Sequence, residues 1–207
     1  MSLAIGLALV AVAAIPIAVT AWLAALPSSA GVSVWNSSIV EGTELESYAT
    51  LSEMVQSADA VVRGQVVSLV AGRVAGARGI DELHYAEATV KVSEVLAGAI
   101  PPGQDEILLE IPLFNGPEYL ATMQAAVPWD ESVYFLRNKG EAARRAGLSA
   151  EAQRAEAKYY RLVIMTAFIV SDRGRAAVAE DAHALEVLNG RSFANALSEV
   201  RASRDGP

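Results

Sequence analysis

The sequence predicts a mainly β protein: a five-stranded antiparallel barrel with short helices, preceded by one N-terminal transmembrane helix. Three observations support this prediction. Residues 85–96 alternate apolar and polar side chains, as a strand with one buried face does. Gly64 lies inside the apolar run 60–70, and a glycine within a strand often marks a bend where a sheet curls. Residues 3–26 carry no charged side chain.

The N-terminal segment, residues 3–26, is long enough as a helix to cross a hydrocarbon core of roughly 30 Å. The alternative is a signal peptide cleaved near Ala30, although the apolar run is longer than usual and no Lys or Arg precedes it. The first basic residue after the segment is Arg63, which favours an extracytoplasmic location for the remainder of the chain. We therefore expect a single-pass protein of the cell membrane whose C-terminal domain lies outside the cytoplasm, or a secreted protein if the segment is cleaved.

The rest of the chain divides into three parts. Residues 27–48 are rich in Ser, Gly and Glu without a sustained period, which is typical of a linker. Residues 49–180 carry the strand patterns and are expected to form the barrel domain. Residues 181–207 are expected to form a C-terminal helix and tail.

The first half of the barrel domain begins with a helix over 49–58, capped by Thr50 or Ser52. The first strand is expected over 60–70, with one face carrying Val62, Gly64, Val66 and Val70. Residues 71–80 hold three glycines and predict a flexible loop. The second strand, 85–96, should bury its alternate apolar residues. The third, 106–111, should do the same and end at Pro112.

Two helical regions separate the later strands. Residues 117–126 predict a short helix closed by Pro128. The insert 141–158 is helical in composition, and it predicts two helices split at Gly147 with Ser149 capping the second.

The remaining elements are three strands and one helix. A fourth strand is expected over 132–137. A fifth, 160–170, is apolar on both faces and should therefore be central or covered. Residues 176–180 predict a short edge strand, and residues 192–201 an amphipathic helix.

Five strands with a helix between the third and the fourth is the order of an OB-type barrel. The segments that carry this resemblance are Ala58–Val66, Ala88–Gly98 and Asp130–Leu136. They resemble uncharacterised exported bacterial β-barrel domains, similar in layout to the OB fold and to tissue-inhibitor or netrin-like modules. The resemblance implies a fold and export, and it implies no catalytic residue.

Several classes of function are disfavoured. The net charge of −8 argues against nucleic-acid binding, which needs a basic surface. The absence of cysteine excludes disulfides, thiolate nucleophiles and cysteine zinc sites. His84 and His183 are far apart in sequence, and no phosphate-binding glycine loop or nucleophile motif is present. We therefore expect no catalytic residue, no metal site and no cofactor.

The candidate site is basic. In an OB-type barrel the loop after the first strand lies beside the loop after the fourth, and ligands commonly bind there. The basic residues expected to bind a ligand in these loops are Arg73, Arg78, Arg137, Lys139, Arg144 and Arg145. Suitable anions outside the cell are lipid headgroups, wall polymers or acidic patches of membrane proteins. The alternative is a solvated helix whose charges pair along its own surface, as Glu141 and Arg145 could.

Two functions remain open on these grounds. The first is a membrane-anchored extracytoplasmic binding or interaction domain that contacts an anionic envelope component. The second is an accessory structural subunit of a larger membrane complex, in which small residues such as Ala14 and Ala18 let the anchor pack closely against other helices. A hydrolase with an unrecognised site is a third and weaker alternative.

Overall fold

The computed structural model describes residues 46–80 and 82–204. The predicted membrane segment 3–26 and almost all of the predicted linker 27–48 lie outside the described residues. No helix in this described part of the chain is long and apolar enough to cross a membrane.

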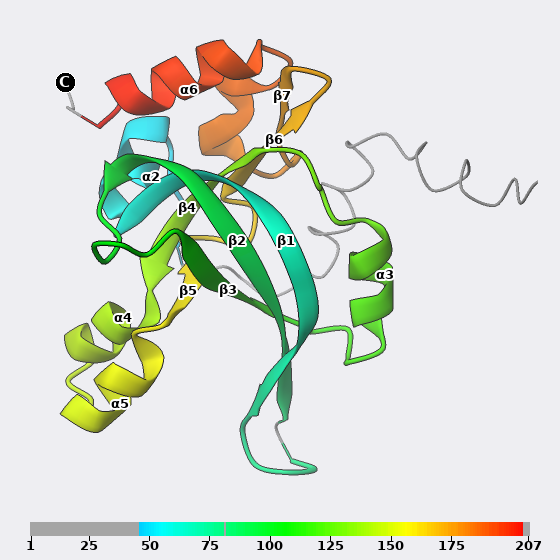
Figure 1. Ribbon diagram of the computed structural model, residues 1–207, viewed down its shortest axis with the longest axis vertical. Coiled ribbons are helices and arrows are strands. Elements are labelled where there is room, and N and C mark those ends of the chain that lie inside the picture. The colour runs from blue at the N-terminus through cyan, green and yellow to red at the C-terminus, as the bar shows by residue number, and fades with distance from the viewer. Residues whose placement is uncertain (1–45, 81, 205–207) are drawn as a thin grey trace, which may run out of the picture.

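The described residues form one sheet of seven strands, and the molecule is mainly β as predicted. The strands are β1 (Ala60–Ala75), β2 (Leu83–Gly98), β3 (Glu106–Pro112), β4 (Ser132–Asn138), β5 (Tyr159–Leu162), β6 (Phe168–Asp172) and β7 (Arg175–Ala177). Their order is β1-β2-β3-β5-β4-β6-β7, and β1 also pairs with β4. The strands β1, β2, β3, β5 and β4 therefore close a ring that is loosely barrel-like (Figure 1). The ring is antiparallel except where β3 and β5 run parallel, at Leu108 and Leu109.

Short helices cover the ring at several places. They are α2 (Leu51–Ser57), α3 (Tyr119–Ala125), α4 (Lys139–Arg145), α5 (Ala150–Glu156), the 3-10 helix η1 (His183–Leu188) and α6 (Phe193–Ala202). The predicted caps Thr50 and Ser149 are confirmed, since their hydroxyls accept from the backbone N–H groups of Glu53 and Ala152. Figure 1 shows α2 and α6 together at one end of the ring, with α4 and α5 toward the other end.

The strand β4 passes through the centre of the core. Val133, Tyr134, Phe135 and Leu136 are all fully buried, so both faces of β4 are covered. Burial raises the pKa of Tyr134 to about 12, an effect that the nearby Ser132 partly offsets.

Gly64 allows β1 to approach β2 closely. A Cβ at this position would stand 2.6 Å from the carbonyl oxygen of Lys91, closer than side-chain carbons are found. The register between β1 and β2 shifts at Gly64 and again between Val66 and Ser68. The shift after Val66 turns Leu69 inward and leaves Val70 46% exposed, so the prediction that Val70 shares a face with Val62 and Val66 was wrong.

The predicted loop 71–80 is largely strand, which corrects the sequence-based boundaries. β1 continues to Ala75 and β2 begins at Leu83, so only residues 76–82 connect the two strands. Residues 71–75 and 83–86 form an extension of the hairpin that we call the β1–β2 arm. It projects downward from the ring in Figure 1. Gly72 misled the prediction because cross-strand pairing continues past it, as between Val74 and His84.

The predicted fifth strand, 160–170, is two strands. Both β5 and β6 pair with β4, and residues 163–167 bulge out between them. Phe135 spans the interruption: its carbonyl accepts from Val163 N at 2.9 Å, and its N–H donates to Ala167 O at 3.1 Å. The expectation that this segment is covered holds for Phe168–Val170, which is buried throughout. The predicted edge strand 176–180 corresponds to β7, shifted toward the N-terminus.

Candidate binding surface

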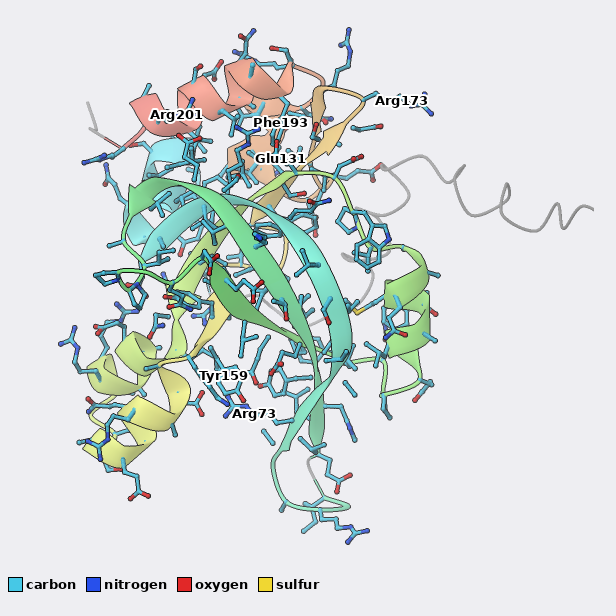
Figure 2. The ribbon with its side chains drawn as sticks, in the orientation of Figure 1. Arg73, Glu131, Tyr159, Arg173, Phe193 and Arg201 are labelled. Atoms are coloured by element: carbon cyan, nitrogen blue, oxygen red, sulfur yellow. The ribbon has the colours of Figure 1, made fainter. Side chains whose placement is uncertain are left out.

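The β1–β2 arm meets the helical insert α4–α5 across a cluster of charged and aromatic residues, which we call the junction. Its members are Arg73, Tyr85, Glu110, Lys139, Glu156 and Tyr159. Figure 2 shows Arg73 from β1 beside Tyr159 from β5, although the two residues are far apart in sequence. The loop regions expected to be neighbours therefore do lie together.

Glu110 is the buried centre of the junction. It comes from β3, and its side chain is only 1% exposed. Its Oε2 accepts from Lys139 Nζ at 2.6 Å and from Arg73 Nη2 at 2.9 Å. Arg73 Nε lies 2.7 Å from Oε1, an ionic contact whose angles fall outside those of a hydrogen bond. A carboxylate buried this deeply is tolerated because two cations compensate it.

Glu156, the last residue of α5, holds the other side of Arg73. Arg73 Nη1 donates to Glu156 Oε1 at 2.5 Å, and Nη2 donates to Oε2 at 2.6 Å. This two-bond fork is the geometry in which a guanidinium binds a carboxylate most strongly. The hydrogen bonds from Arg73 hold the pKa of Glu156 below its ordinary value, and the pairing with Glu156 raises the pKa of Arg73.

Two tyrosine rings complete the junction. The Arg73 guanidinium lies 4.6 Å from the centre of the Tyr159 ring, and Lys158 Nζ lies 4.6 Å from the same centre. Lys139 Nζ lies 4.8 Å from the Tyr85 ring centre. Each contact is within the range of a cation–π interaction. Burial raises the pKa of Tyr85, so this ring stays neutral in ordinary buffers.

Of the six predicted binding residues, the structure brings only Arg73 and Lys139 into the junction. Arg78 is exposed in the turn at the end of the arm. Arg137 donates from Nη1 to Glu46 at 2.5 Å and from Nη2 to the Tyr48 hydroxyl at 2.8 Å. It therefore joins the end of β4 to the segment before α2.

Arg144 and Arg145 lie on α4 and point to different partners. Arg144 pairs with Glu141 at 2.6 Å along the helix surface. Arg145 makes hydrogen bonds of 3.0 and 3.1 Å to Asp59, whose Oδ2 also accepts from Asn138 N. Glu141 therefore pairs along the helix with Arg144 and not with Arg145, because Asp59, just before β1, lies within reach of Arg145.

The charges of the junction balance. Arg73 and Lys139 supply two positive charges, and Glu110 and Glu156 supply two negative ones. Sequence reasoning missed both carboxylates and both tyrosines. The one available signal was Glu110 itself, a charged residue between Leu109 and Ile111 in an otherwise apolar part of the strand.

In the described part of the chain, no three His, Asp or Glu side chains gather as a metal site would require. Comparison of the sequence with protein-family models and with curated proteins finds no match. The resemblance to exported bacterial barrel domains therefore has no family match to support it.

Proposed function

We propose that the protein is a membrane-anchored extracytoplasmic binding domain, built on an OB-type barrel, that contacts an anionic envelope component through the junction and through the exposed turn that holds Arg78. The observation that carries this proposal is the meeting of the β1–β2 arm with the α4–α5 insert through Arg73 and Glu156. Loops in these two positions form the ligand-binding face of OB-type barrels.

The order of the ring supports the OB-type assignment. Its five strands pair as β1-β2-β3-β5-β4 and close back onto β1, with α3 between β3 and β4. The extracytoplasmic location is supported by the uncharged segment 3–26 and by the absence of basic residues from there to Arg63.

The test measures retention of the tagged full-length protein on isolated cell envelopes. Arg78→Glu reverses an exposed charge at the tip of the arm and is expected to lower retention several-fold. Arg173→Glu is the matched control, because Arg173 is 88% exposed on the turn between β6 and β7 (Figure 2). Retention should also fall as salt rises. Retention that is unchanged by Arg78→Glu and insensitive to salt would overturn the proposal.

A second proposal is an accessory subunit of a larger membrane complex. It is favoured by exposed apolar side chains on and beside β1. Val67 is 47% exposed, and Trp129, whose carbonyl accepts from the Gln65 side chain, is 53% exposed. Such residues are typical of protein contacts. Purification in mild detergent should then yield a stoichiometric membrane partner that Trp129→Asp removes, and isolation of the chain alone would count against this proposal.

A further inference from the structure

We propose that Glu156 occupies an anion-binding site formed by Arg73 and Lys139, and that a phosphate-bearing ligand takes its place when the Glu156 side chain turns outward. This inference rests on the proposed function and names the ligand chemistry of the same surface. Glu156 then acts as an internal competitor for its own site.

The two carboxylates of the junction are not equivalent. Glu110 lies on a strand paired on both sides, and its side chain is 1% exposed. Glu156 ends the seven-residue helix α5, and its side chain is 23% exposed. Glu110 is therefore a fixed partner of the two cations, whereas Glu156 can rotate into solvent without disturbing a strand.

The charge that remains suits an anion. With Glu156 turned away, Arg73 and Lys139 retain only Glu110, which leaves one net positive charge. The guanidinium fork that now holds the two Glu156 oxygens matches two oxygens of a phosphate equally well. Lys139 Nζ lies 3.9 Å from Glu156 Oε2, so a ligand oxygen in that place would meet the ammonium group as well.

The cationic half of the site stays in place without Glu156. Arg73 is held by Glu110 and lies over the Tyr159 ring. The end of α5 is fixed independently, because Asn138 Nδ2 donates to Ala157 O at 2.7 Å. Release of the site therefore needs rotation of one side chain and no movement of the insert.

The experiment titrates inorganic phosphate into the purified full-length protein by calorimetry, at constant ionic strength set with chloride. In wild type, phosphate can bind only during the fraction of time that Glu156 leaves the site, and its apparent affinity is reduced by that fraction. Glu156→Gln should therefore bind phosphate about tenfold more tightly than wild type. Adding Arg73→Gln to that variant should abolish the gain. Glu141→Gln is the control, since it removes a carboxylate paired with Arg144 on the same insert.

Equal phosphate affinity in wild type and a folded Glu156→Gln variant would overturn the inference. If that variant does not fold, wild-type protein is titrated with phosphate, and the chemical shifts of the Arg73 side-chain N–H signals are followed by nuclear magnetic resonance. A selective shift of these signals supports the site, and unchanged signals refute it.

Two further comparisons identify the source of the phosphate and distinguish a failure of this inference from a failure of the proposed function. If Glu156→Gln gains binding over wild type for phosphatidylglycerol vesicles and not for phosphatidylcholine vesicles, the ligand is a lipid headgroup. If the variant gains binding for inorganic phosphate alone, the ligand is a free phosphate. If envelope retention changes neither with salt nor with Arg78→Glu while Glu156→Gln still binds phosphate more tightly than wild type, only the proposed function is contradicted. Salt-sensitive retention without a gain in Glu156→Gln contradicts the inference only.

Discussion

Gly140 on α4 lies directly against Ala157, the residue that follows α5: a Cβ at position 140 would stand 2.7 Å from the Cα of Ala157. Lys139 precedes this contact in one helix, and Glu156 precedes it in the other. This contact between α4 and the end of α5 therefore fixes the spacing of Lys139 and Glu156 in the junction.

Gly140→Ala should force the two helices of the insert apart. Overpacking of this kind costs about 1–3 kcal/mol in the free energy of unfolding. The measurement is the denaturant midpoint of the variant against wild type. An unchanged midpoint would mean that the helices have room for a methyl group between Gly140 and Ala157.

Gly64→Ala should destabilise the ring where β1 touches β2. The new methyl group would meet the Lys91 carbonyl at 2.6 Å, and we expect a loss of about 2 kcal/mol. Gly72→Ala is the matched control on the same strand, because its nearest atom, the Tyr85 carbonyl oxygen, lies at 3.1 Å. Equal losses in the two variants would contradict a special role for Gly64.

Glu110→Ala should be among the more damaging substitutions in the junction. It leaves Lys139 and Arg73 partly buried without their shared carboxylate, at a cost of about 3 kcal/mol in unfolding free energy. Glu141→Ala, which removes an exposed carboxylate, should change stability by no more than about 0.5 kcal/mol. Similar small effects of both substitutions in urea unfolding would show that Glu110 is not a structural centre.

The stabilising effect of Glu156 should depend on pH. Its folded-state pKa lies below the ordinary value of 4.5, because Arg73 donates to the ionised form. Its contribution is therefore full above pH 4.5 and is lost as pH falls through the lowered folded pKa. We expect wild type to exceed Glu156→Gln by about 1 kcal/mol at about pH 7 and by progressively less in acid.

The measurement is a series of urea unfolding curves from neutral to acid pH for both proteins. Asp59 and Glu46 also have lowered pKa values, but they are present in both proteins and cancel in the difference. A difference that stays constant or grows in acid would contradict the pairing of Glu156 with Arg73.

Much of the strand content was predictable because one-sided burial leaves a pattern. Ala86, Ala88 and Val90 are fully buried as their alternation indicates. The bulge after Val66 and the excursion 163–167 were not predictable. A one-residue register shift moves the following side chains to the opposite face of the sheet, and no residue type marks where it occurs. A segment that is apolar on both faces gives no sign of where its pairing with the neighbouring strand stops.

The candidate site was predictable in position and not in chemistry. The order of strands and helices indicated that the first hairpin meets the insert, and Arg73 and Lys139 do lie there. The partners of these cations could not be inferred. Glu110 is 37 residues from Arg73 and Glu156 is 83, so their pairing depends on the closure of the ring.

The most direct test of the anion site is the crystal structure of the full-length Glu156→Gln variant, purified in detergent and crystallised with phosphate. We expect a phosphate whose oxygens accept from both Nη groups of Arg73 and from Lys139 Nζ, with the substituted side chain turned toward solvent. A substituted amide still bonded to Arg73, with no phosphate between them, would contradict the proposal.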